Sequence, residues 1–154
     1  MINKKNYWLI VLLAIAAGMV LAAGCTTTQA AGDKVFLEKA EYHTTTVNGT
    51  MYELMSQMNE MEIGGSIVKA DELKVEADAA TADLSNLTVS PQRQAYKDEL
   101  LQAFSNLSRG ASSVNESLTI LSNGNQTEAI RISEEGGPIM DLGVEHLEKA
   151  KSLR

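Results

Sequence analysis

Five asparagines of this 154-residue chain stand two positions before a serine or a threonine, in the pattern that oligosaccharyltransferases modify. They are Asn48, Asn86, Asn106, Asn115 and Asn125. Chance gives about one or two such triplets for this content of Asn, Ser and Thr, so five is an excess. The triplets predict N-linked glycosylation after export. The alternative is a Ser- and Thr-rich helical surface on which they arise unused.

None of the residues two positions before these asparagines is acidic. They are Thr46, Leu84, Phe104, Ser113 and Asn123. Bacterial N-glycosylation systems resemble one another in preferring an acid at that position, so the triplets favour an archaeal-type system. At Asn125 a second role competes, because the same side chain can cap a helix that is expected to begin there.

The only cysteine, Cys25, closes an N-terminal stretch with the order of an export signal. Lys4 and Lys5 come first, an uncharged apolar run from Trp8 to Ala23 follows, and Gly24 precedes the cysteine. The basic end of such a segment stays in the cytoplasm while the apolar part enters the translocon. A lone cysteine makes no internal disulfide and no structural zinc or iron–sulfur site, so its position explains it better than redox chemistry does.

The residues Leu21-Ala22-Ala23-Gly24-Cys25 resemble the lipobox of bacterial and archaeal lipoproteins, although the usual pattern has Leu at the position of Ala22. The resemblance implies a lipid on the thioether of Cys25, cleavage of residues 1–24, and anchoring at the outer face of the cytoplasmic membrane. The alternative is an ordinary signal or signal-anchor, short for the roughly 17–25 residues that span a bilayer. The small, polar residues 25–32 are expected to form a flexible tether.

Methionines recur at helical spacing after the tether. Met51, Met55, Met58 and Met61 follow His43, and thioethers together with imidazole are ligands for Cu(I). The same spacing suits a helix core, where methionine fills gaps. The core interpretation is favoured, because no His-x-Met or Met-x-Met cluster occurs.

No constellation for catalysis or for a resident cofactor or metal is apparent. The residues three before His43 and His146 are Ala40 and Gly143, so the Glu-x-x-His pairs of di-iron bundles are absent. The sequence has no Gly-x-Ser-x-Gly nucleophile motif and no phosphate-binding glycine loop. The sequence therefore predicts a protein that is not an enzyme.

The charge of the chain is strongly negative, at −7, and reaches −9 once the two lysines of residues 1–24 are removed. Such a chain repels phosphate backbones, which excludes nucleic-acid binding. Glu134, Glu135 and Asp141 have the oxygen ligands for Ca²⁺, but solvated helix surface explains them more simply.

Apolar residues at helical spacing predict an all-α, antiparallel up-down four-helix bundle over residues 33–154. Gly64-Gly65 is expected to end the first helix, Ser66 to cap the second and Ser90-Pro91 to begin the third. Asn123-Gly124 should end the third helix, and Pro138 should break or kink the fourth. The expected buried positions are Ala40, Thr44, Val47, Met51, Leu54, Met58 and Met61; Ile67, Ala70, Leu73, Ala77, Leu84 and Leu87; Leu100, Phe104, Leu107, Ala111, Val114, Leu118 and Leu121; and Ala129, Ile132, Ile139, Leu142, Leu147, Ala150 and Leu153.

Three classes of function fit these features. The first is a non-enzymatic structural or interaction module of the cell envelope, with the membrane and an envelope protein as partners. The second is a ligand-recognition module that works through a membrane partner, and the third is a Met-rich copper carrier. A structural rod should have a filled core, whereas a recognition module should have a cavity between helices near residues 136–138.

Overall fold

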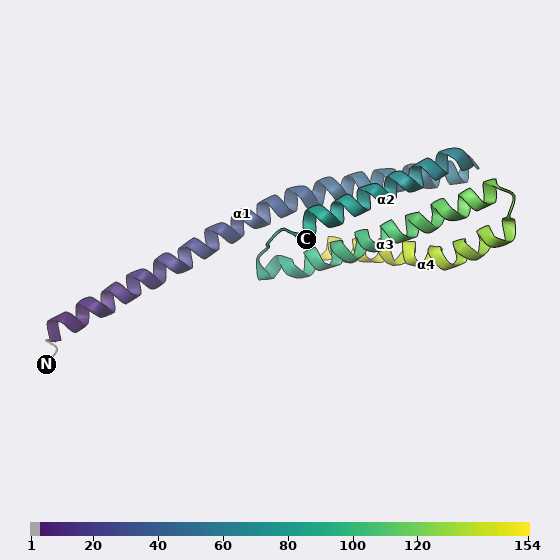
Figure 1. The fold of residues 1–154 in the computed structure, drawn as a ribbon. Helices are drawn as coiled ribbons and strands as arrows, with labels where there is room; N and C mark the ends of the chain where they lie inside the picture. Colours follow the sequence, from purple (N-terminus) through teal and green to yellow (C-terminus); the bar gives the residue numbers. More distant parts are fainter. Residues whose placement is uncertain (1–3) are drawn as a thin grey trace.

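A computed structural model describes the backbone of residues 4–154 and the side chains from residue 29 onward. Four helices make up this part of the chain: α1 (Lys4–Asn59), α2 (Ile63–Ser85), α3 (Pro91–Ser122) and α4 (Gln126–Leu153). Figure 1 shows them lying side by side over the length of the bundle, with α1 continuing past it toward the N terminus. Residues 4–154 contain no strand, which confirms the predicted all-α class.

Polar contacts between α1 and α2 order the two helices. Lys39 Nζ donates to Asp83 Oδ2 at 3.0 Å, and Thr50 Oγ1 donates to Glu76 Oε2 at 2.7 Å. Residue numbers therefore rise along α1 where they fall along α2. The α1–α2 and α3–α4 turns lie at the end of the bundle far from the N terminus, and the α2–α3 connection lies at the other end (Figure 1).

The centre of the bundle is formed by the predicted apolar positions, among them Leu73, Leu100, Phe104 and Leu107, which are at most 1% exposed. Phe36, upstream of the expected stripe, is also fully buried and meets Tyr96 edge-on, with the ring centroids 5.6 Å apart. Five of the expected buried positions are wrong, because their side chains are exposed. They are Met58 at 45%, Met61 at 86%, Leu121 at 37%, Leu142 at 47% and Leu153 at 40%.

The ends of α3 and the start of α4 follow the sequence prediction. Ser90 is the extended residue before α3, Pro91 is its first residue, and the helix ends before Asn123. Gly124 then takes a φ of 86°, and the Asn125 side chain accepts a hydrogen bond from the Glu128 backbone N–H at 3.3 Å. A proline without an N–H and a glycine with positive φ suit these positions.

The α1–α2 turn differs from the prediction. α1 ends at Asn59, and Met61 takes the left-handed conformation with a φ of 59°. The Glu62 N–H donates to the Gln57 carbonyl and the Met61 N–H to the Met58 carbonyl, which is the Schellman pattern with methionine where glycine is usual. Gly64-Gly65 therefore lie inside α2.

Ser66 does not cap α2, because it lies one turn inside the helix. Its hydroxyl donates to the Glu62 carbonyl at 2.8 Å, and the residue is 1% exposed.

Of the two outcomes expected at Pro138, a break or a kink, the break is wrong, because α4 runs through the proline. Proline removes the N–H that would bond the Glu134 carbonyl, but both residues are exposed, so water can satisfy that carbonyl. On the opposite side, α4 packs closely on α3, and this contact keeps the helix continuous.

The structure is helical over residues 25–32, where the sequence predicts a flexible tether. Gly32 lies against the α2–α3 connection, where an added Cβ would come within 2.7 Å of the Thr88 carbonyl oxygen. The adjacent Asp33 accepts a hydrogen bond from the Ser90 N–H at 2.7 Å. Cys25 lies outside the residues whose side chains are described. In the part of the chain that the structure describes, no helix has an apolar stretch long enough to cross a membrane.

Candidate functional site

A cavity with a volume of about 440 Å³ lies between α1 and α4, and we call it the seam groove. This volume is within the range of ligand pockets, roughly 300–1,000 Å³. Its lining is apolar apart from two serines and one carboxylate. The residues are Met51, Leu54, Met55 and Met58 of α1, Ser113 and Val114 of α3, and Ser133, Gly136, Gly137, Met140, Asp141 and Val144 of α4.

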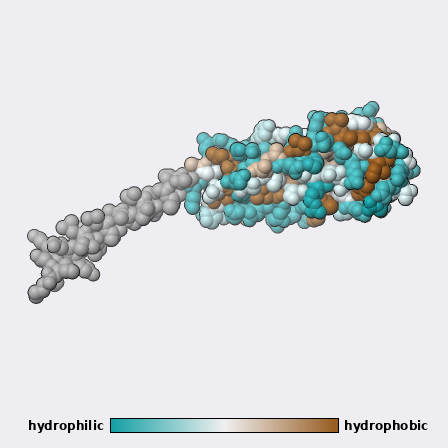
Figure 2. Space-filling model, viewed as in Figure 1, coloured by the Kyte–Doolittle hydropathy of each residue, from teal (hydrophilic) through white to brown (hydrophobic). Residues whose placement is uncertain are grey.

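Two smaller cavities continue the seam groove toward the α1–α2 and α3–α4 turns. A cavity of about 270 Å³ shares Met58, Val114 and Ser133 with the groove, and a cavity of about 250 Å³ shares Met58. No charged residue lines either cavity. Figure 2 shows hydrophobic residues gathered toward this end of the molecule. The three cavities are neighbours along the outer half of the bundle, and we call this row of cavities the apolar channel.

The seam between α1 and α4 is open because α4 packs so closely on α3. A Cβ added at Gly110 of α3 would come within 2.9 Å of the Met140 Cα, and one added at Gly143 of α4 within 2.7 Å of the Leu107 Cγ. Gly136 faces Ser113 across the same interface, where a Cβ would clash. Small residues let two helix backbones approach closely, and α3 and α4 make the most extensive contact of any helix pair.

The two adjacent glycines of α4 both line the seam groove but differ in what surrounds them. Gly136 is buried against α3, whereas Gly137 is half-buried and has no atom within 4 Å of the place where its Cβ would stand. Gly137 therefore leaves space that a side chain would fill. The absence of a side chain at Gly137 enlarges the groove without serving helix packing.

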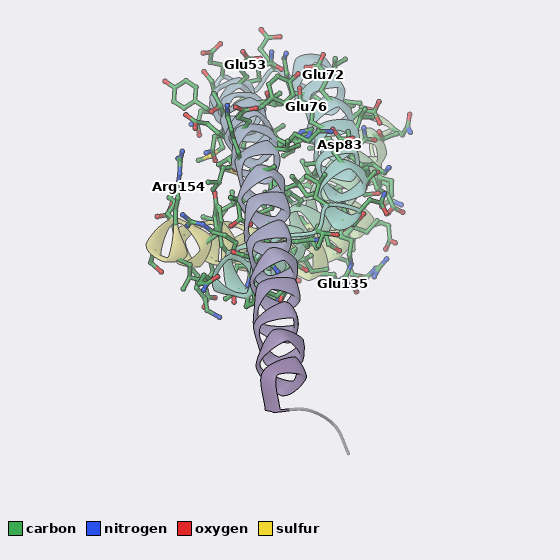
Figure 3. The ribbon with its side chains drawn as sticks, turned by 90° about the vertical axis from the view of Figure 1, so that its left-hand side faces the viewer. Glu53, Glu72, Glu76, Asp83, Glu135 and Arg154 are labelled. Carbon is green, nitrogen blue, oxygen red and sulfur yellow. The ribbon has the colours of Figure 1, made fainter. Side chains whose placement is uncertain are left out.

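Polar contacts tie α1 to α2 rather than to α4. Besides the Lys39–Asp83 and Thr50–Glu76 contacts, Lys69 of α2 forms an ion pair with Glu53 of α1 at 2.7 Å. Among the described residues, no ion pair joins α1 to α4 itself; Arg154, the residue after α4, pairs with Glu41 of α1 at 2.7 Å, at the end nearer the N terminus. Figure 3 looks along α1 and shows Arg154 and Asp83 on opposite sides of it.

Both histidines of the chain form interhelical pairs with carboxylates. His43 Nε2 lies 3.2 Å from Asp83 Oδ2, and His146 Nδ1 lies 2.7 Å from Glu99 Oε2. A hydrogen bond from Lys39 and then one from His43 lower the pKa of Asp83. The pKa of Glu99 is likewise lowered, first by Lys149 and then by His146.

These pairs fasten α1 to α2 and α3 to α4. In the described part of the chain, no group of three or more His, Cys, Asp or Glu side chains is close enough to hold a metal ion.

The methionines and His43, which the sequence places on one helix, do not come together. Met51, Met55 and Met58 line the seam groove with Met140, whereas Met61 lines only the cavity at the tip. His43 is buried on the α2 side of α1, where its ring contacts Asp83. The thioethers are therefore the groove's apolar lining, without an imidazole beside them.

The five predicted glycosylation sites lie in two kinds of surroundings. Asn86 and Asn125 are exposed at helix ends, and their partners Thr88 and Thr127 are exposed too. The other three asparagines are half-buried within helices, and the hydroxyls of their triplets are buried and bonded. These bonds run from Thr50 to Glu76, from Ser108 to Asp78 at 2.6 Å and from Ser117 to the Ala129 carbonyl at 2.8 Å, while Asn115 Nδ2 donates to the Ile67 carbonyl at 3.1 Å.

The groove residues of α4 were not identified from the sequence as a site, although a cavity near residues 136–138 was one expectation. Gly136 and Gly143 continue the buried series that runs through Ala129, Ile132, Leu147 and Ala150. A search for large apolar residues passes over glycine, and it therefore assigned Leu142 to the core. Recognising glycine at core spacing would have indicated the close α3–α4 contact.

No family model, no curated protein and no solved structure matches this chain.

Proposed function

We propose that this chain is a membrane-anchored, extracytoplasmic, non-enzymatic binding module of the cell envelope, and that the seam groove is its binding site. The observation that carries the proposal is the cavity of about 440 Å³ between α1 and α4 beside Gly136 and Gly137. A purely structural rod has no need of an open apolar cavity, because filling it would add stability. The ligand-recognition alternative is therefore favoured over the structural one.

The proposed architecture is an antiparallel up-down four-helix bundle behind an N-terminal signal segment. The opposite order of contacts along α1 and α2, and the placing of the α1–α2 and α3–α4 turns at one end, support the antiparallel arrangement. The basic, apolar and small residues up to Cys25 support the signal and the lipid anchor.

The position of the groove suits a module that reaches away from a membrane. Met51 lies 26 residues after Cys25, which at 1.5 Å per residue of helix is about 40 Å. A partner held in the membrane or in a surface layer can therefore meet the groove without contacting lipid headgroups.

Within the proposed glycoprotein, Asn86 and Asn125 are the two sites open to modification on a folded domain. Asn48, Asn106 and Asn115 accept a glycan only if the enzyme reaches them before the bundle folds, because their triplets are helical and hydrogen-bonded. Archaeal-type modification remains part of the proposal.

The anchor is tested by the mass of the protein extracted from its native membranes. We expect a chain that begins at lipid-bearing Cys25, with sugar on Asn86. A Cys25→Ser variant should remain unprocessed or be released without lipid. A chain that keeps residues 1–24 and carries no lipid would contradict the anchor assignment.

The binding site is tested by NMR of the mature protein in phosphatidylcholine nanodiscs, with ¹³C-labelled methionine methyl groups. Five methionines follow Cys25, and four of them, all but Met61, line the seam groove. With hexan-1-ol as an uncharged apolar probe, we expect saturable shifts of these four methyl signals, abolished by Gly137→Leu. Shifts that are absent, or that rise without saturating, would contradict a binding cavity.

The Met-rich copper carrier remains the lesser candidate, favoured only by the four thioethers around one cavity. Cu(I) added to the same labelled protein should shift all four methyl signals at one equivalent if that function is correct.

A further inference from the structure

We infer that the occupant of the seam groove is a basic amphipathic helix of a partner protein. This inference rests on the proposed function and specifies its ligand. Three independent features of the groove carry it: its length, its lining and the charge beside it.

The length of the channel suits a helix better than a small molecule. The cavity of about 250 Å³ has no α4 residue in its lining. The seam groove and the adjoining cavity of about 270 Å³ are lined by α4 residues from Gln126 to Val144. This stretch of helix is about 27 Å long at 1.5 Å per residue. An apolar channel of that length, open along the side between two helices, matches one face of a helix of about 18 residues.

The lining suits an apolar helix face. Met51, Met55, Met58 and Met140 supply flexible thioether side chains, which re-pack around the side chains of a bound helix. Met55 and Met58 are 58% and 45% exposed, so the apolar surface is already available in the free protein. The apolar lining has few polar groups to anchor a sugar, a nucleotide or another polar ligand.

The charge beside the channel selects a basic partner. Asp141 lines the groove, and Glu134 and Glu145 lie seven residues before it and four residues after it, on the same side of α4. All three are exposed, and the ion pairs of the described residues do not include them. The nearby Arg131 is held by Glu128 at 2.6 Å and by Glu135 at 2.5 Å.

A second copy of this chain fits the groove less well, because it would bring its own excess of negative charge to an acidic edge. Like charges placed face to face oppose association. A helix with leucines on one face and lysines flanking them would match both the apolar channel and its acidic edge.

The test uses the mature lipoprotein in uncharged phosphatidylcholine nanodiscs and two fluorescein-labelled 18-residue peptides. Both peptides have the same leucine face, and their polar positions are lysine in one and glutamate in the other. Fluorescence anisotropy should show the lysine peptide binding at least about tenfold more tightly than the glutamate peptide, which corresponds to about 1.4 kcal/mol. The preference should shrink as NaCl is raised, because salt screens exposed charges.

Two variants locate the binding. Gly137→Leu places a side chain in the groove and should weaken binding of the lysine peptide at least about tenfold. Gly49→Leu is the matched control, because Gly49, like Gly137, is a helical glycine with no atom within 4 Å of its Cβ position, and it lies exposed outside the groove. The double variant Asp141→Asn, Glu145→Gln should reduce the preference for lysine while the methionine signals still respond to hexan-1-ol.

The outcomes separate the inference from the proposed function. Equal binding of both peptides, or binding that Gly137→Leu leaves unchanged, overturns the inference. Saturable hexan-1-ol binding without peptide binding also overturns it, but leaves the groove as a site for small apolar ligands. If sedimentation shows dimers that Gly137→Leu dissociates, the occupant is a second copy and the inference is wrong. If neither peptide nor hexan-1-ol binds, the proposed function fails as well.

Discussion

Substituting Gly110 by alanine should destabilise the bundle, although alanine is the better helix former. An added Cβ at Gly110 meets the Met140 Cα and Cβ at 2.9 Å and its backbone N at 3.0 Å. Backbone atoms cannot move away by changing a rotamer, so α3 and α4 must separate. Overpacking of this kind costs about 1–3 kcal/mol. The gain in helix propensity offsets only about 0.5–1 kcal/mol of that cost.

Gly49→Ala isolates the packing cost of the Gly110 substitution. Gly49 is exposed within α1 and has no atom near its Cβ position, so its substitution gives the propensity gain alone. The two variants should therefore differ by about 1–3 kcal/mol in free energy of unfolding, or roughly 4–12 °C in Tm at about 4 °C per kcal/mol. Thermal unfolding followed by circular dichroism at 222 nm measures both. Equal Tm values would refute the close α3–α4 contact and the reason given for the open seam.

Three further perturbations test the packing, the turn and the electrostatics. Leu107 is fully buried, so Leu107→Ala should lower the free energy of unfolding by about 2–5 kcal/mol. Leu142 is exposed, so Leu142→Ala should change it by less than about 0.5 kcal/mol, and urea unfolding measures both. Met61→Gly should raise stability by about 1 kcal/mol in the same assay, because glycine adopts the left-handed turn without strain; a loss would contradict the turn geometry. Lys149 lowers the pKa of Glu99 in the folded state, so the Glu99 carboxylate stabilises the fold above its unfolded pKa near 4.5, and this stabilisation is lost as pH falls through the folded pKa. The Glu99→Gln variant should therefore lose less stability than the wild type between pH 5 and pH 3. Identical pH profiles of the two proteins would contradict this.

The helical class and most of the core could be predicted from residue spacing. Leu100, Phe104, Leu107 and Ala111 recur at intervals of three and four, which places them on one face of a helix wherever that helix packs. Ser90-Pro91 also mark their helix end locally, because a proline at the first helical position needs no partner for its missing N–H. The signal segment and the anchor at Cys25 remain predictions from sequence.

The α1–α2 turn shows where local reasoning failed. Gly64-Gly65 are the residues that most favour a helix end, yet the chain turns at Met61 and accepts a strained φ of 59° there. Packing of the buried residues of α2, beginning with Ser66, fixes where that helix must start. Burial of a whole helix face outweighs the conformational cost of one residue.

The sequence determined which residues are apolar, how they are spaced and that the chain is acidic, since each of these is a property of neighbouring positions along one helix. Only the tertiary structure decided that α4 lies close to α3 and leaves its seam with α1 open. That choice depends on Gly110, Gly136 and Gly143 meeting residues of another helix, and the free energy of such a contact belongs to the pair of surfaces rather than to either segment. The groove between α1 and α4 is a consequence of that pairing.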